Sequence, residues 1–152
     1  MTDQFIISHA TIADLESVTR LFDAYRVWYH QTSDPDRARS FLQQRLLNNE
    51  ATVFLARDAD GKAAGFALLY PLFSSISMDA VWILNDLFVA ETHRGQGLGS
   101  ILLEAATEFA RETGAIRMEL EAAQYNTGAQ QLYQRHGWTR SEEFQRWIKE
   151  LG

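Results

Sequence analysis

Three glycines, an arginine and a serine stand together in the segment Arg94 to Ser100, which reads RGQGLGS. An apolar run precedes this segment and a helical pattern follows it, so it lies at a strand-to-helix junction. Glycines leave the backbone amides of such a turn uncovered, and the first N–H groups of a helix lack intrahelical acceptors and lie at the positive end of its dipole. The segment therefore predicts an anion site suited to phosphate groups, with Arg94 adding positive charge.

Two common phosphate-binding patterns fit this turn poorly. A Walker A loop needs a lysine after its last glycine, and the residue after Gly99 is Ser100. A dinucleotide-binding pattern that starts at Gly95 would place its third glycine at Ser100. Glu119 and Glu121 stand about twenty residues further on, where a ribose-binding acid would be needed, so a nucleotide-dependent oxidoreductase remains an alternative.

Two polar residues, Asn85 and Asp86, interrupt the apolar run from Val81 to Val89 (VWILNDLFV). A run of this kind is typical of a central strand that is covered on both faces. A carboxylate within it could act as a general base. The two polar residues could equally face solvent near the end of the strand, and the run by itself leaves both interpretations open.

The pattern of apolar residues also predicts the elements that position these groups. Helical patterns cover 11–30, 34–49, 98–113 and 127–136, and strand patterns cover 5–8, 52–57, 63–70, 81–89, 117–122 and 144–151. Leu98, Ile101, Leu102, Ala105 and Phe109 mark the expected buried face of the third helix. This order predicts the α/β (α+β) class, with a mixed sheet and helices on both of its faces.

Length and composition set further limits on fold and function. The chain has 152 residues, 46% of them apolar and only two of them proline, as expected for one globular domain over residues 1–152. It has no cysteine, which excludes disulfides, thiolate metal sites and a cysteine nucleophile. Its four histidines show no metal-ligand spacing, so we expect no metal. A formal charge of -6 gives no electrostatic reason to bind nucleic acid.

Neither a leader nor a membrane span is expected. The start of the chain, Met1 to Ser8, lacks the basic and apolar regions of a secretion signal. The longest apolar run, Phe66 to Phe73, is too short to cross a bilayer. These features predict a cytoplasmic protein without a membrane partner.

Arg94, Gly97 and Gly99 resemble the acyl-CoA-binding pattern Q/R-x-x-G-x-G/A of the GNAT N-acetyltransferases, at the same strand-to-helix junction. The similarity extends from Trp82 to Trp138, through LNDLFV and LEAAQYNTGAQQLYQRHGW, while the first eighty residues match only in element order. The resemblance implies the GNAT fold, a mixed, mostly antiparallel twisted sheet of about six to seven strands. It also implies transfer of an acetyl group from acetyl-CoA, as co-substrate, to a primary amine.

The resemblance assigns cofactor contacts along the chain. In the family, the central strand and the next one splay apart, and the pantetheine arm bonds to strand backbone, here that of Leu87, Phe88 and Val89. The diphosphate lies on the turn, which consists of Arg94, Gly95, Gln96, Gly97, Leu98, Gly99 and Ser100.

Asn126 matches a cofactor contact and could equally be a helix N-cap. Tyr133 matches the tyrosine that protonates the departing CoA thiolate, although a packing role in its helix is the plainer alternative.

The chemistry requires a proton acceptor, because an amine of lysine type is protonated near pH 7 and cannot attack a thioester in that form. Asp86 is the leading candidate, Glu121 on the neighbouring strand is the second, and Asn85 is expected to hold a water. The absence of cysteine favours direct attack in a ternary complex. The amine pocket is expected between the N-terminal helices and the loop after the hairpin. Its candidate lining residues are Trp28, Tyr29, Phe73 and Trp82, whereas Tyr25 is expected in the core.

The acceptor is expected to be a small-molecule or peptide amine. The LNDLFV strand resembles the branch of the family that acts on polyamines or basic protein side chains. The apolar final strand could form the interface of a homodimer. A noncatalytic acyl-CoA-binding sensor that kept the cofactor turn is the alternative.

Overall fold

The computed structural model describes residues 4–152. The chain divides into two compact units, and the boundary between them in the sequence lies between Glu121 and Ala122. The expectation that no leader is present rests in part on residues 1–3, which lie outside the described part. In the first unit the elements follow one another as β1 (Ile6–His9), a 3-10 turn (Ile12–Asp14), α1 (Leu15–Trp28), α2 (Pro35–Leu47), β2 (Thr52–Arg57), β3 (Ala63–Ser74), β4 (Asp79–Val89), a second 3-10 turn (Glu91–His93), α3 (Leu98–Glu112) and β5 (Arg117–Glu119). The second unit contains α4 (Thr127–Arg135).

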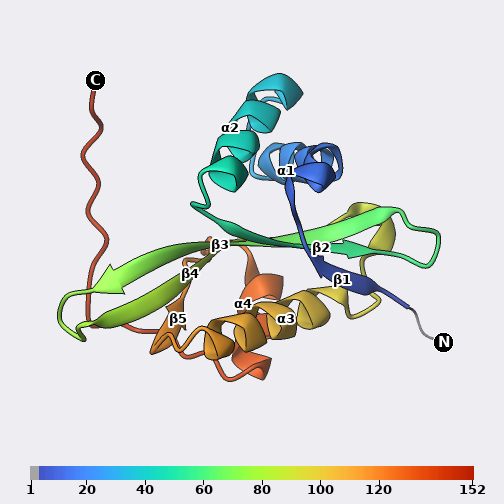
Figure 1. The fold of residues 1–152 in the computed structure, drawn as a ribbon. Helices are drawn as coiled ribbons and strands as arrows, with labels where there is room; N and C mark the ends of the chain where they lie inside the picture. Colours follow the sequence, from blue (N-terminus) through green and yellow to red (C-terminus); the bar gives the residue numbers. More distant parts are fainter. Residues whose placement is uncertain (1–3) are drawn as a thin grey trace. The chain divides into compact units, whose positions relative to one another are not determined.

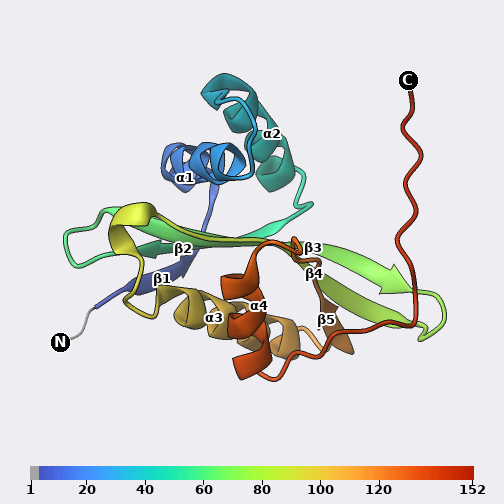
Figure 2. The same ribbon diagram turned by 180° about the vertical axis from the view of Figure 1, so that it is seen from behind.

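The strands of the first unit form one sheet in the order β1-β2-β3-β4-β5. The first four strands pair antiparallel, and only β5 runs parallel to its neighbour β4. The expected mixed, mostly antiparallel sheet is therefore confirmed, with five strands among the described residues instead of six to seven. Figures 1 and 2 show α1 and α2 over one face of this sheet and α3 against the other.

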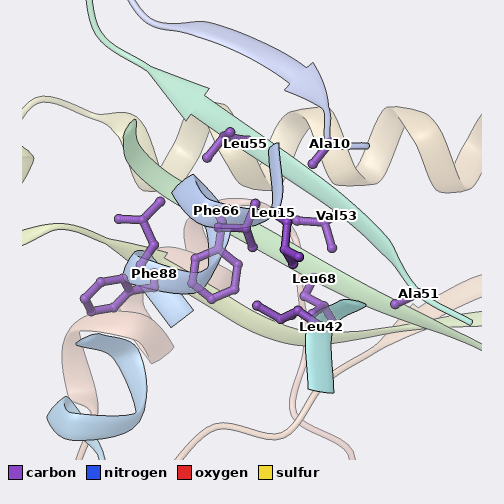
Figure 3. Close-up of a cluster of buried hydrophobic side chains, with 11 residues drawn as sticks. Ala10, Leu15, Leu42, Ala51, Val53, Leu55, Phe66, Leu68 and Phe88 are labelled. Carbon is purple, nitrogen blue, oxygen red and sulfur yellow. The ribbon is translucent and has the colours of Figure 1, made fainter. Parts of the chain in front are cut away.

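A buried apolar cluster holds α1 and α2 on the sheet. Val18 of α1, Leu42 of α2 and Phe66 and Leu68 of β3 are all 0% exposed and belong to it. Figure 3 shows how Leu42, Phe66, Leu68 and Phe88 converge between the helices and the strands. Each large apolar side chain buried in this way stabilises the fold by about 1.5 to 3 kcal/mol, so the cluster fixes the position of α1 relative to β4.

Local signals start the two N-terminal helices. Thr11 and Asp14 form a capping box, in which the Thr11 hydroxyl accepts from Ala13 N and an Asp14 carboxylate oxygen accepts from Thr11 N. Asp34 caps α2 by accepting from Arg37 N, and Pro35 occupies its first turn. These bonds satisfy amide groups that a helix leaves without internal acceptors.

The C-terminal part of the chain differs from the expectation. Residues 144–151 do not form the predicted strand, and β5 ends at Glu119 instead of continuing to residue 122. Phe144, Trp147, Ile148 and Leu151 are between 65% and 92% exposed. Alternating apolar residues specify a strand only when a sheet edge offers hydrogen-bond partners, which the pattern cannot reveal.

The buried face of α3 consists of Leu98, Leu102, Leu103, Ala106 and Ala110, whereas Ile101, expected on that face, is 40% exposed. Ala105 and Phe109, also expected there, are half-buried, so the fully buried face is displaced along the helix from the one that the spacing predicted. Among the described residues, no helix is long and apolar enough to span a membrane.

Candidate functional site

A β-bulge at Asn85 shapes the middle of β4. Leu68 of β3 pairs with Asp86 and Leu69 pairs with Leu84, so Asn85 is the extra residue between them. The bulge leaves Asn85 exposed, while Leu84 and Asp86 on either side of it are 3% and 6% exposed. The Asn85 amide Nδ2 lies 3.2 Å from each oxygen of the Asp86 carboxylate. The two polar residues that interrupt the apolar run therefore form one hydrogen-bonded pair.

The Asp86 carboxylate points toward the face of the sheet that α1 covers. The Tyr25 hydroxyl of α1 donates a hydrogen bond to it, and burial raises the pKa of Asp86 above its ordinary value while the bonds from Asn85 and Tyr25 oppose that rise. Burial and the nearby charge of Asp86 together raise the pKa of Tyr70. A carboxyl that holds its proton more tightly than usual is suited to general-base chemistry near neutral pH.

Tyr25, expected in the core, also contacts the polar pair on β4. Its ring packs at 5.8 Å from the rings of both Phe66 and Phe88, as expected for a residue of the core. The same side chain also carries the hydroxyl that bonds to Asp86. Helical spacing identified the buried face of α1, but no sequence signal linked that face to a carboxylate sixty-one residues later in the chain.

β4 and β5 separate after a short stretch of pairing. They pair only at Val81–Arg117, Trp82–Met118 and Ile83–Glu119. Beyond that point lies a pocket of about 340 Å³ that is lined by Ile83, Leu84, Asn85, Glu119, Leu120 and Glu121. Among the described residues, no strand pairs with β4 on this side at Leu87, Phe88 and Val89. This stretch of β4 therefore has no strand partner on this side among the described residues, although the Val89 carbonyl oxygen accepts from Arg94.

The glycine-rich turn has the conformation of an anion site. Gly95 and Gly97 lie in the left-handed region at φ 80° and 78°, and residues 94–97 are exposed. A Cβ at either glycine would meet nothing within 4 Å, so the backbone angle, not lack of space, requires glycine there. No side chain caps the start of α3. A helix start without a capping side chain, preceded by exposed glycines, suits a phosphate ligand.

Arg94 lies beside the end of β4. Its Nε donates to the Val89 carbonyl oxygen at 3.0 Å, and its guanidinium carbon lies 5.5 Å from the centre of the Phe88 ring. The structure thus brings the positive charge next to the exposed edge of β4 as well as next to the turn. An anion bound on the turn and an extended arm along β4 would both lie near this side chain.

The aromatic candidates for the amine pocket divide into two groups. Trp28 and Tyr29 end α1, and a row of ring contacts of 5.0 and 5.1 Å leads from Trp28 through Tyr29 to Tyr25. Trp82 instead packs at 5.1 Å from Phe109 of α3, and its Nε1 donates to Thr113 Oγ1 at 2.9 Å. Trp82 therefore lies on the face opposite to Tyr25, because α1 and α3 cover different faces of the sheet (Figure 1).

Phe73 and Glu121 take positions that the sequence did not indicate. Phe73 is 80% exposed near the end of β3, where it pairs with Ala80 of β4 at the far end of the hairpin from Asp86. Glu121 is exposed and lies beyond the end of β5, on the wall of the pocket. Glu119, on the same wall, forms an ion pair of 2.7 Å with Arg117.

In the second unit, Asn126 and Tyr133 belong to α4. Asn126 is the N-cap, and its Oδ1 accepts from Ala129 N at 3.2 Å. The Tyr133 ring is half-buried and lies 5.9 Å from the ring of Trp138. Gln130, which sequence reasoning did not select, ties the preceding loop to the helix by donating to the carbonyl oxygen of Ala123 at 3.0 Å.

Within the described residues, no group of three or more histidine or acidic side chains could hold a metal ion.

The chain is similar in sequence and fold to known acetyltransferases. A model of the acetyltransferase (GNAT) family matches residues 15–138. The chain is 39% identical to the uncharacterized N-acetyltransferase YhfO of Bacillus subtilis (strain 168) over 138 residues, 91% of this chain and 92% of that protein. A crystal structure of a probable acetyltransferase is similar with a TM-score of 0.90 at 38% identity, covering 97% of this chain and 98% of that one. An aminoglycoside N-acetyltransferase in complex with CoA shares the fold, with a TM-score of 0.81 at 22% identity over 99% of this chain and 98% of that one.

Proposed function

Because the chain belongs to the acetyltransferase (GNAT) family, whose members use acetyl-CoA, we propose that it acetylates a primary amine by direct attack within a ternary complex. The observation that carries this proposal is the placement of the buried Asp86 carboxylate, through Asn85, next to the pocket where β4 and β5 separate. A pocket beside an exposed strand edge suits an acyl carrier, and a buried carboxylate suits removal of a proton from the attacking amine.

The residues present fit the co-substrate in two places. The uncapped start of α3, with left-handed Gly95 and Gly97, offers amides and a helix dipole to the diphosphate of CoA. Leu87, Phe88 and Val89 offer backbone groups to the pantetheine arm, and Arg94 adds a positive charge between the two places. Asn126 is the further cofactor contact that the family resemblance implies.

In the proposed reaction, the amine first loses a proton to Asp86, either directly or through a water held by Asn85. Glu121, on the wall of the pocket, is the second candidate for this role. The amine nitrogen then forms a bond to the acetyl carbon and the carbon–sulfur bond breaks. The departing thiolate takes its proton from the Tyr133 hydroxyl, and the second proton that the nitrogen loses as the amide forms restores that hydroxyl. Positioning of the two substrates contributes much of the rate, because no covalent enzyme intermediate is needed.

The acceptor is proposed to be a cationic small molecule or a lysine-type side chain. Glu119, Glu121 and Asp86 surround or adjoin the pocket, and the chain carries a formal charge of -6, so a positively charged amine is attracted to this region. Trp28 and Tyr29 at the end of α1 are proposed to contact the carbon chain of the acceptor. Trp82 and Phe73 do not lie with this group and are not assigned to it.

The two units are proposed to act as one catalytic domain in the cytoplasm, where an enzyme of acyl-CoA metabolism finds its co-substrate. The family match supports this proposal because residues 15–138 extend across the boundary between the units. A homodimer is also proposed. The exposed apolar side chains Phe144, Trp147, Ile148 and Leu151 support it, since large apolar side chains left in solvent are often covered at an interface.

An acetyl-transfer screen tests the proposed function. Purified protein is incubated with acetyl-CoA and a panel of diamines, polyamines, lysine peptides and aminoglycosides, and release of free CoA is measured. The proposal expects release above background with at least one class of cationic amine, and calorimetric binding of CoA without any amine. A noncatalytic sensor would bind CoA and release none, whereas a protein that binds no CoA when folded would exclude both functions.

A further inference from the structure

His93 occupies a buried position immediately before the glycine-rich turn. Its side chain belongs to the second 3-10 turn (Glu91–His93) and the residue is 9% exposed. The ring Nε2 lies 2.8 Å from a carboxylate oxygen of Asp58, and Nδ1 lies 3.0 Å from the hydroxyl of Thr92. Both ring nitrogens therefore have partners, and one of these partners is an ionisable group thirty-five residues earlier in the chain.

Asp58 is a rigid anchor for this contact. It opens the turn between β2 and β3, and its second carboxylate oxygen accepts from the backbone amides of Asp60 and Lys62, both at 2.9 Å. Its own amide donates to the Lys62 carbonyl oxygen at 2.9 Å. The bond from the His93 ring, together with the bond from the Lys62 amide, lowers the pKa of Asp58. The carboxylate is thus ionised and fixed in direction at neutral pH.

In the turn that follows His93, the Arg94 side chain bonds to the Val89 carbonyl oxygen at the end of β4. Residues 94–97 are exposed, and two of the four are glycines in the left-handed region. Glycine has more accessible backbone conformations than any other residue, so ordering such a segment on ligand binding costs conformational entropy. Upstream, Ala90 N donates to the Ala64 carbonyl oxygen at 2.8 Å, and His93 N donates to the Ala90 carbonyl oxygen at 2.9 Å. The His93 side chain is therefore the last link to the sheet before the turn begins.

We propose that His93 is a positioning residue for the co-substrate, which it serves by tying the entrance of the glycine-rich turn to Asp58 of the β2–β3 hairpin. In this way the amides at the start of α3 are held in the geometry that receives the diphosphate before CoA binds. Binding to a preorganised turn does not have to include the cost of ordering it. This inference rests on the proposed function, because it concerns the affinity of the same site for CoA.

Two substitutions at His93 separate the hydrogen bond from the shape of the ring. His93→Phe keeps a planar ring but has no donor toward Asp58, whereas His93→Gln retains an N–H near the position of Nε2. We expect His93→Phe to raise KM for acetyl-CoA and the Kd for CoA by roughly five- to twentyfold, with kcat at saturating acetyl-CoA within about twofold of wild type. His93→Gln should recover most of the lost affinity.

An acetyl donor that lacks the diphosphate provides the decisive measurement. S-Acetylpantetheine cannot contact the turn through phosphate groups, so its kcat/KM should be the same in wild type and His93→Phe. If His93→Phe does not fold, Asp58→Ala takes its place, with Asp60→Ala in the same hairpin turn as the matched control. A double variant of His93 and Asp58 should bind CoA no more weakly than the weaker single variant, because both substitutions remove the same hydrogen bond.

The outcomes distinguish this inference from the proposed function. Wild-type protein that binds no CoA would refute the proposed function and leave nothing for His93 to position. Wild-type protein that binds CoA, with His93→Phe binding equally well, would overturn the inference alone. Equal losses with acetyl-CoA and with S-acetylpantetheine would also overturn it, because they would indicate a general structural role.

Discussion

The hydroxyl of Tyr25 in α1 donates a hydrogen bond to the buried carboxylate of Asp86 in β4. This bond links a helix of the N-terminal part to the bulged central strand, and Asn85 extends the link to the pocket beside β5. The apolar cluster under α1 holds the helix in place, so the proposed proton acceptor depends on core packing for its environment (Figure 3).

Removing the Tyr25 hydroxyl should change the pH at which the enzyme becomes active. The Tyr25 bond lowers the pKa of Asp86, against the upward effect of burial, so Tyr25→Phe should raise that pKa further. The acidic limb of kcat/KM should then move to higher pH, with activity about three- to tenfold lower on that limb and near wild type at alkaline pH. Tyr29→Phe keeps the Tyr25 bond and should leave the limb in place. An unmoved limb in Tyr25→Phe would show that Asp86 is not the titrating base.

Replacing Asp86 itself should abolish that limb. In wild type, kcat/KM should rise with pH through the raised pKa of Asp86, because the base acts only when it is ionised. Asp86→Asn should lower kcat by about 10²- to 10³-fold and flatten the profile. If kcat and the profile are retained, Glu121 or water is the acceptor, and Glu121→Gln becomes the variant to measure.

The same substitution should change the pH dependence of stability. Asp86 titrates near its ordinary pKa of about 3.9 in the unfolded chain, while burial raises its pKa in the folded protein. Between these two values the folded state binds more protons, so the free energy of unfolding contributed by this group falls as pH rises. In Asp86→Asn, the free energy of unfolding should no longer decrease with pH in this way, as measured by urea unfolding at a series of pH values. An identical pH dependence in both proteins would contradict the buried environment of the group.

Gly97→Ala should weaken both the turn and its ligand affinity. Gly97 has φ 78°, and an L-residue in that conformation costs about 1 to 2 kcal/mol. We expect a comparable loss in the free energy of unfolding and a Kd for CoA that is about tenfold higher, measured by urea unfolding and calorimetry. Gly128→Ala in α4 is the matched control, since its φ is not positive and a Cβ there would meet nothing within 4 Å. The control should be neutral or slightly stabilising, because alanine favours a helix.

Tyr133→Phe should slow release of the thiol without weakening CoA binding. The departing thiolate would lose its proton donor, and kcat should fall by about ten- to a hundredfold while the Kd for CoA stays within twofold. Tyr125→Phe, on the exposed loop before α4, serves as the control. Unchanged turnover in Tyr133→Phe would mean that solvent or another group protonates the thiolate.

Several features could be predicted from the sequence because neighbouring residues decide them. The capping box of Thr11 and Asp14 and the cap at Asp34 are closed by bonds between residues two or three positions apart. The left-handed angles of Gly95 and Gly97 follow from the residue type that tolerates them. Alternating and continuous apolar runs predicted β2, β3 and β4, since each strand buries its own side chains in the sheet.

The tertiary structure alone decided how distant groups meet. The bulge at Asn85 depends on the register between β3 and β4, and it determines that Asp86 faces α1 while Trp82 packs on α3. The contact between His93 and Asp58 joins two turns that are thirty-five residues apart in the chain. A strand at 144–151 required an available sheet edge, and the apolar pattern there was insufficient to form it. Local propensity and short-range hydrogen bonds act within a few residues of the chain, whereas register, burial and side-chain partnership are settled only when the sheet and its helices pack together.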